Sequence, residues 1–109
     1  MPDYYIKEND TGPPLQVTLY DGNDDAVDLT GATVVFSMSG AGVAKVSEQS
    51  TTEVTPASGV VKYAWQSGDT DTPGSYIGEF EVTFGDGTIQ TYPNTRAKQL
   101  NIHIMKEIA

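Results

Sequence analysis

The sequence contains no cysteine and only one histidine, His103. Without cysteine there is no disulfide, no thiolate nucleophile and no cysteine-bearing zinc site, while the redox compartment stays open, because cytosolic folding is one of several explanations for the absence. A single histidine cannot build a histidine-rich metal centre. These two absences exclude Cys/His chemistry and a histidine-rich metal centre, and we predict a protein without a cofactor.

Basic residues and long apolar runs are also scarce. Six Lys and Arg stand against 15 Asp and Glu, for a net charge of −9. Such a surface is repelled by phosphate backbones and anionic membranes, so nucleic acid is not expected as a partner. The apolar runs fall far short of the ~20 residues that span a bilayer. The start, MPDYYIKEND, has neither the basic region nor the apolar core of a signal peptide. We predict no membrane insertion.

The charge is unevenly distributed along the chain. Residues 1–54 carry nine acids and two bases, a balance of −7, whereas residues 55–109 carry six acids and four bases, a balance of −2. If the two halves form different faces, a milder face with Arg96, Lys98 and Lys106 could orient docking. The other interpretation is that the charges lie on solvated loops that keep the protein soluble.

The pattern of apolar residues predicts strands. The 109 residues suffice for one hydrophobic core, and 11 glycines and 6 prolines tilt the composition away from helix. Apolar and polar residues alternate strictly in several segments, as they do in half-buried strands. The predicted inward-facing residues are Leu15, Val17 and Leu19; Val34, Phe36 and Met38; Val61, Tyr63 and Trp65; Tyr76, Gly78, Phe80, Val82 and Phe84; and Leu100, Ile102 and Ile104.

Turn residues separate these segments. Asp86-Gly87 between FEVTF and TIQTY predicts a β-hairpin with a type I′ turn. Residues 43–54 alternate weakly and predict one or two edge strands, with Lys45, Glu48 and Glu53 discouraging pairing with other chains. About seven to eight strands without a crossover helix indicate one all-β domain over residues 1–109, an antiparallel immunoglobulin-like β-sandwich.

One tyrosine bears on the immunoglobulin-like topology. Tyr76 follows the acidic, Pro/Gly-containing loop SGDTDTPG at the start of a predicted strand. Immunoglobulin-like sandwiches place a tyrosine corner at such a position. The alternative is that Tyr76 is one more core aromatic residue.

No residue pattern predicts catalysis. His103 alternates with Ile102 and Ile104 and is expected to face solvent, without a nucleophile motif such as G-x-S-x-G. Glu79 and Glu81 lie two apart on one strand and are expected to be solvated, whereas a glycosidase places its two carboxyl groups across a cleft. We predict that the chain is not an enzyme and assign no catalytic, cofactor-binding or metal-binding residue.

The acidic segment from Asp21 to Asp28 offers carboxylates and an asparagine in the manner of a calcium loop. Ala26 and Ala32 stand where an EF-hand requires glycine and a bidentate glutamate, so that motif fails. Two interpretations remain, a polar turn and a looser calcium site. The ligands of such a site would come from Asp21, Asn23, Asp24 or Asp25.

Apolar and aromatic residues near the termini predict binding. Tyr4, Tyr5 and Ile6 at one end, with Met105 and Ile108 at the other, are either docking segments or ordinary edge strands. A second hypothesis is a carbohydrate- or cell-surface-binding module in which exposed tyrosines serve as stacking platforms. Its candidate residues are Tyr4, Tyr5, Tyr20 and Tyr92.

Three longer segments, met in order, resemble a known family. DLTGATVVFSM, WQSGDTDTPGSY and FEVTFGDGTIQTYPN are similar to the N-terminal domain of the baseplate upper protein of tailed phages. The resemblance covers nearly the whole chain. It implies an immunoglobulin-like module in a virion tail or baseplate, which anchors a multi-copy protein whose later part carries or holds receptor-binding parts.

The resemblance defines the functional expectation. The chain is expected to be a phage or prophage structural protein that folds in the bacterial host cytoplasm and assembles into the virion. Its partners would be other tail or baseplate proteins and further copies of itself, and the family transfers no catalytic residue. The sequence stops at Ala109 without the later receptor-holding part. It is therefore expected to be either a small free-standing virion protein or one domain of a larger one.

Overall fold

The computed structural model describes residues 3–93 and 99–108. Within them the chain forms nine strands and one short 3₁₀ turn, Pro56–Ser58. The strands are β1 (Tyr4–Lys7), β2 (Leu15–Thr18), β3 (Thr33–Gly40), β4 (Val43–Ser50), β5 (Thr52–Thr55), β6 (Val60–Tyr63), β7 (Gly74–Thr83), β8 (Ile89–Tyr92) and β9 (Leu100–Met105).

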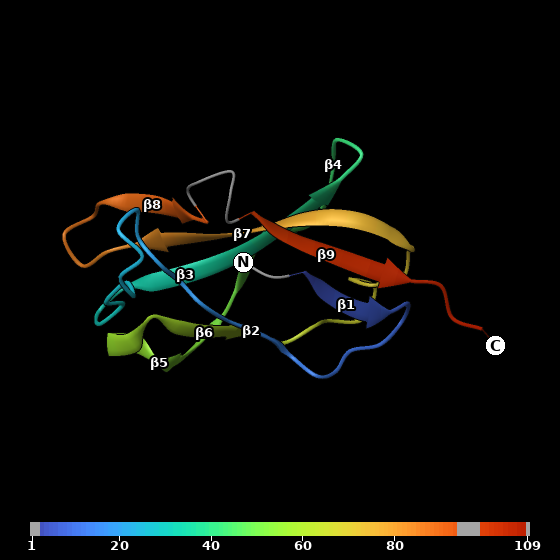
Figure 1. Ribbon diagram of the computed structural model, residues 1–109, viewed down its shortest axis with the longest axis horizontal. Coiled ribbons are helices and arrows are strands. Elements are labelled where there is room, and N and C mark those ends of the chain that lie inside the picture. Colours follow the sequence, from blue (N-terminus) through green and yellow to red (C-terminus); the bar gives the residue numbers. More distant parts are fainter. Residues whose placement is uncertain (1–2, 94–98, 109) are drawn as a thin grey trace.

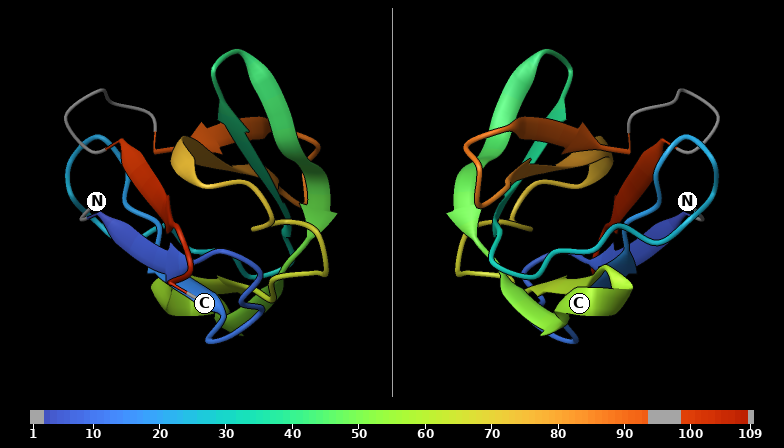
Figure 2. Two further views of the ribbon diagram at one scale, coloured as in Figure 1. Left: turned by 90° about the vertical axis from the view of Figure 1, so that its right-hand side faces the viewer. Right: turned by 90° about the vertical axis from the view of Figure 1, so that its left-hand side faces the viewer.

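The strands form two layers. The larger sheet has six strands in the order β1-β9-β7-β3-β4, with β8 beside β7, and the smaller sheet has the order β2-β6-β5. Figure 1 shows the smaller sheet below the larger one, and Figure 2 shows the same two layers end-on. The predicted all-β sandwich is confirmed. Two details differ from expectation: the described residues contain nine strands, and β1 pairs with β9 in parallel.

The two differences have separate origins. Residues 43–54 split at Thr51, so that β4 forms an edge of the larger sheet and β5 an edge of the smaller one. The C-terminal partner of β7 is divided as well, because β8 pairs with the second half of β7 and β9 with its first half. The parallel pair arises because the first strand joins the sheet beside the last one, with Tyr4 opposite Ile102.

Apart from its first strand, the strand order matches that of an immunoglobulin-like sandwich. By position, β2, β6 and β5 correspond to strands B, E and D, while β9, β7 and β3 correspond to G, F and C. β4 extends the second group, as strand C′ does in variable-type domains. The first strand lies beside G instead of beside B, which leaves the smaller sheet with three strands.

Aromatic residues from both sheets fill the core. The Phe36 ring centroid lies 4.7 Å from that of Tyr63 and 5.0 Å from that of Phe80. Trp65 meets Tyr63 edge-on at 5.4 Å, and both are buried, as predicted, although β6 ends at Tyr63. Phe84 is only partly buried, because it lies past the end of β7.

The hairpin between β7 and β8 is confirmed, but its predicted turn type is wrong. Gly87 has a φ of 90°, whereas Asp86 is not among the residues with positive φ, so a type I′ turn is excluded. The Gly87 N–H donates to the Phe84 carbonyl and the Phe84 N–H donates to the Thr88 carbonyl. This is a three-residue loop with a bulge at Gly87. This geometry requires glycine at the third loop position, where Gly87 stands, whereas the predicted type I′ turn would have placed Gly87 second of two central residues.

A two-residue turn with type I′ φ values occurs instead between β3 and β4. Ala41 and Gly42 have φ values of 53° and 78°, and Gly40 pairs with Val43 across them. This hairpin projects from the body of the molecule in Figure 1. The sequence did not predict it, because alanine is an unusual residue in the left-handed region.

Candidate binding surfaces

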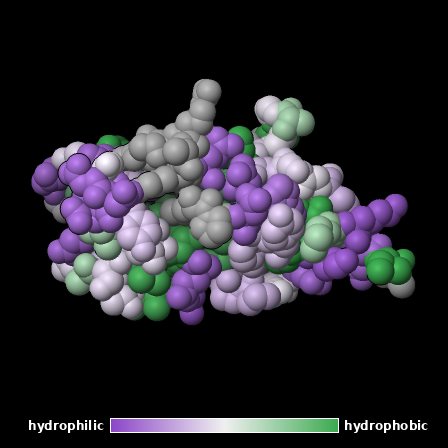
Figure 3. Space-filling model, in the orientation of Figure 1, coloured by the Kyte–Doolittle hydropathy of each residue, from purple (hydrophilic) through white to green (hydrophobic). Residues whose placement is uncertain are grey.

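A groove follows β2 along one side of the sandwich. Its volume is about 530 Å³, within the range of ligand pockets. Figure 3 shows green, apolar atoms near the middle of the face seen in Figure 1, among paler and purple ones. The groove is lined by Asp3, Tyr4, Leu15, Gln16, Val17, Thr18, Tyr20, Asp24, Pro93 and Leu100.

Two of the four tyrosines proposed as stacking platforms meet in this groove. Tyr20 is 42% exposed, and the Tyr4 hydroxyl donates to the Pro13 carbonyl at 3.0 Å. Tyr5 points to a different surface, the outer face of the larger sheet. The prediction for Tyr92 is wrong, since it is 2% exposed. It lies opposite Phe80 and therefore on the core face of β8.

The outer face of the larger sheet carries a patch of neighbouring residues, which we call the outer-face patch: Tyr5, Ile77, His103 and Met105. Tyr5 stacks on His103 with a centroid separation of 4.8 Å. The exposed fractions of Tyr5, Ile77 and Met105 are 59%, 42% and 39%. His103 lies on the outward side of β9, as predicted, and is half-buried.

The structure brings two polar residues to His103 that the sequence did not associate with it. The Ser75 Oγ lies 3.3 Å from His103 Nδ1, and Asp3 Oδ2 lies 3.7 Å from Nε2, beyond hydrogen-bond distance. The three residues come from β7, β9 and the segment before β1, so no local motif signals them. Serine, histidine and aspartate are also the residue types of the acyl-transfer triad. Acyl transfer requires, in addition, N–H donors aimed at the substrate oxygen. In the ladder that joins Ser75 and His103 the backbone N–H groups lie in the plane of the sheet and do not supply such donors above its face.

The glutamates on the same face form no pair across a cleft. Glu79 is exposed and Glu81 half-buried, both on the outward side of β7. They lie opposite Ser37 and Val35 of β3. This is the solvated strand face predicted for them.

The acidic segment after β2 is organised as a turn. The Asp21 Oδ1 accepts hydrogen bonds from the backbone N–H of Asn23 at 2.8 Å and of Asp25 at 3.1 Å. Asp24 adopts a φ of 64°, which Asp tolerates better than most residues. In the part of the chain that the structure describes, no group of three or more His, Cys, Asp or Glu is arranged to hold a metal ion.

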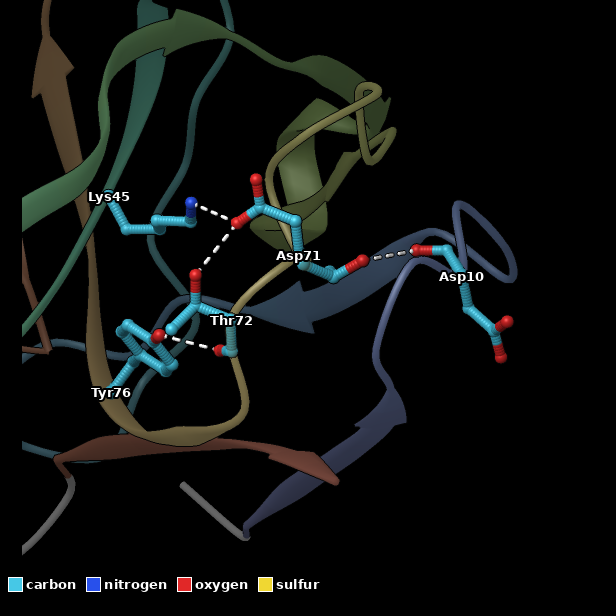
Figure 4. A network of polar contacts seen from close by, with 6 residues as sticks. Asp10, Lys45, Asp71, Thr72 and Tyr76 are labelled. Carbon is cyan, nitrogen blue, oxygen red and sulfur yellow. Dashed lines mark hydrogen bonds and ion pairs between the residues drawn. The ribbon is translucent and has the colours of Figure 1, made fainter. Parts of the chain in front are cut away.

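A network of polar contacts ties the loop between β6 and β7 to its surroundings (Figure 4). Lys45 forms an ion pair with Asp71, whose Oδ1 also accepts from the Thr72 hydroxyl at 2.9 Å. The hydrogen bond from Lys45 is the main cause that holds the pKa of Asp71 below its usual value and raises the pKa of Lys45. The Thr70 hydroxyl donates to the Asp10 carbonyl at 2.8 Å. These contacts hold the loop in place. Lys45 therefore forms an ion pair with Asp71, in addition to the role on an edge strand that the sequence predicts for it.

The predicted milder face cannot be assembled from the described residues. Arg96 and Lys98 lie outside them, and Lys106 is exposed just beyond β9.

Residues 3–93 and 99–108 contain no helix with the length and apolarity needed to cross a membrane.

No protein-family model matches the chain, and no curated protein matches it either.

Proposed function

We propose that the chain is a docking module of a phage or prophage tail or baseplate, and that it acts by binding other virion proteins and further copies of itself. Its function is binding rather than turnover. The proposal places the protein in the virion after folding in the bacterial cytoplasm.

Two kinds of observation support the proposal. The first is the resemblance of three segments, among them WQSGDTDTPGSY, to the N-terminal domain of the baseplate upper protein. The second is the fold, because the resemblance implies an immunoglobulin-like module and the strand order is of that kind. Fold alone does not define function, so the proposal depends on a surface that can dock.

The outer-face patch is the observation that carries the proposal. Tyr5, Ile77 and Met105 are apolar, 39–59% exposed, and adjacent by strand register around His103. A sheet face offers the broad, flat area that a stable protein contact of about 1,200–2,000 Å² requires. Aromatic residues and methionine are also enriched at such contacts. We therefore assign docking to this face.

The carbohydrate-binding hypothesis has less support. It needs several tyrosine faces presented together, yet Tyr92 is buried and Tyr5 lies on a different surface from Tyr4 and Tyr20. The Tyr4 hydroxyl donates to the Pro13 carbonyl and accepts a hydrogen bond from Trp65 Nε1. We retain the docking function as the proposal.

Charge placed in the outer-face patch tests the proposal. Ile77→Glu and Tyr5→Glu should leave the melting temperature within a few degrees, because both side chains are exposed, and should abolish incorporation into purified tail particles, measured by mass spectrometry. The matched control is Ile89→Glu, since Ile89 is 59% exposed at the start of β8, where it lies opposite Thr83 and away from the patch. Wild-type protein that is absent from purified particles would refute the virion role. Patch variants that incorporate normally would refute the assignment of docking to this face.

A further inference from the structure

In the part of the chain that the structure describes, strand β2 has an open edge. Among the described strands it pairs with β6 alone, with Leu15 opposite Tyr63 and Val17 opposite Val61. One residue past the end of β2, the Leu19 N–H donates to the Gly59 carbonyl at 2.8 Å. Backbone groups in an antiparallel ladder point to alternate sides, so the odd-numbered residues face β6. The N–H and C=O groups of Gln16 and Thr18 therefore point away from β6.

The groove lies along this open edge. All four residues of β2 line it, and Tyr4 of β1 and Leu100 of β9 line it from the larger sheet. Its volume is about 530 Å³. An apolar channel thus runs beside a row of backbone donors and acceptors, which is the arrangement that accepts an added strand.

The topology explains why a place is open here. The larger sheet is five strands wide along its main order, whereas the smaller sheet is three strands wide. In constant-type immunoglobulin domains strand A lies beside strand B, and strand B corresponds to β2 of the smaller sheet here. Here β1 lies beside β9 instead, so the position next to β2 is left without a strand from the described residues.

We propose that this flank binds an extended segment of a partner protein, which adds a fourth strand beside β2. The segment would present apolar residues at alternate positions to the groove and would carry Lys or Arg rather than acids. The chain has a net charge of −9, and Asp3 lies at the groove. A second copy would bring the same −9, so charge favours a different protein as the donor. The inference is independent of the outer-face patch and of the virion role.

Binding of a defined probe tests the inference. The probe is the synthetic peptide acetyl-KTVTVTVTK-amide, titrated into the ¹⁵N-labelled full chain and followed by NMR and amide hydrogen exchange. We expect chemical-shift changes along β2 and slower exchange of the Gln16 and Thr18 amides. Two matched peptides separate the contribution of backbone hydrogen bonds from that of charge. N-methylation at alternate residues should abolish binding by removing the backbone donors, and replacing both lysines with glutamate should weaken binding by about tenfold.

Proline substitution in β2 provides the complementary test. Gln16→Pro removes an N–H that points into the groove and leaves the ladder to β6 intact, as edge strands tolerate. It should abolish peptide binding, whereas Gln16→Ala, which retains the N–H, should not. If Gln16→Pro does not fold, Thr18→Pro removes the next outward N–H.

Several results would overturn the inference. They are no shift at about 1 mM of the unmodified peptide, equal binding of the N-methylated peptide, or shifts at the β4 or β5 edges instead of β2. Protection of Gln16 and Thr18 without peptide, in a dimer detected by light scattering, would identify a second copy as the occupant. A neutral oligosaccharide that shifts Tyr4 and Tyr20, where the peptide does not, would assign the groove to glycans.

Discussion

The hydroxyl of Tyr76 donates a hydrogen bond of 2.7 Å to the backbone carbonyl of Thr72, four residues earlier in the chain. Gly40 at the end of β3 makes room for the ring, since a Cβ at that position would lie 2.7 Å from the Tyr76 Cδ1 atom. This is the tyrosine corner of immunoglobulin-like sandwiches, at the entry to strand F. Tyr76 is therefore more than a core aromatic residue.

Removal of that hydroxyl should destabilise the fold. Tyr76→Phe keeps the ring and leaves the Thr72 carbonyl without its donor, so we expect a loss of about 1–2 kcal/mol in urea unfolding. The control is Tyr5→Phe, because Tyr5 is 59% exposed. Equal stability of Tyr76→Phe and the wild type would show that the corner contributes nothing.

Trp65 should be one of the most costly residues to truncate. It is 4% exposed, and its ring meets those of Phe36 and Tyr63 edge-on. Trp65→Ala should cost about 3–5 kcal/mol, because the cavity cannot fully collapse. Val54→Ala, at a 43% exposed position, should cost far less. A loss below about 1 kcal/mol, or a tryptophan emission maximum typical of full exposure, would contradict the structure here.

The bulge at Gly87 predicts intolerance of side chains. Its φ of 90° is a conformation that β-branched residues resist, so Gly87→Val should lower the melting temperature clearly. Gly22→Val is the control, because Gly22 lies in another exposed turn without a positive φ and with open space around it. If both variants melt alike, the conformation of Gly87 does not matter.

Ala41 offers the opposite prediction, a gain in stability. Its φ of 53° places alanine in the left-handed region, where asparagine is favoured. Ala41→Asn should raise the free energy of unfolding by about 0.5–1 kcal/mol. The same substitution at Ala44, within β4, should not stabilise. No gain at Ala41 would mean that the hairpin tip carries no strain.

The Lys45–Asp71 pair predicts sensitivity to acid. The pKa of Asp71 is lowered mainly by the hydrogen bond from Lys45 and then by Thr72, and the pKa values of Asp28 and Asp86 are lowered by hydrogen bonds from Thr30 and Thr88. A lowered folded-state pKa contributes stability above the unfolded value of about 4, and this is lost as the pH falls through the folded value.

The measurement is the urea midpoint at pH values from neutral to about 2. We expect a decline below about pH 4, with a shallower decline in Asp71→Asn, which should already be less stable at neutral pH. Lys45→Met removes the partner and should behave alike. An unchanged slope in both variants would mean that the pair does not contribute to acid unfolding.

Sequence alternation determined which side chains enter the core. A strand points successive residues to opposite faces, so burial of Phe36, Phe80 and Ile102 follows from local order alone. The acidic turn at Asp21 was equally predictable, because Asp bonds its own backbone neighbours. Turn type was predicted less well, since the left-handed φ of Ala41 depends on the paired strands that flank it.

Only the tertiary structure decided how the strands are placed relative to one another. Alternation is the same whichever neighbour a strand has. It could therefore not place β1 beside β9, or leave one edge of β2 without a partner among the described strands. The approach of Asp3, Ser75 and His103 depends on that same placement, because the three residues are remote in the chain. Both candidate binding surfaces therefore come from long-range pairing, while the core that supports them comes from local pattern.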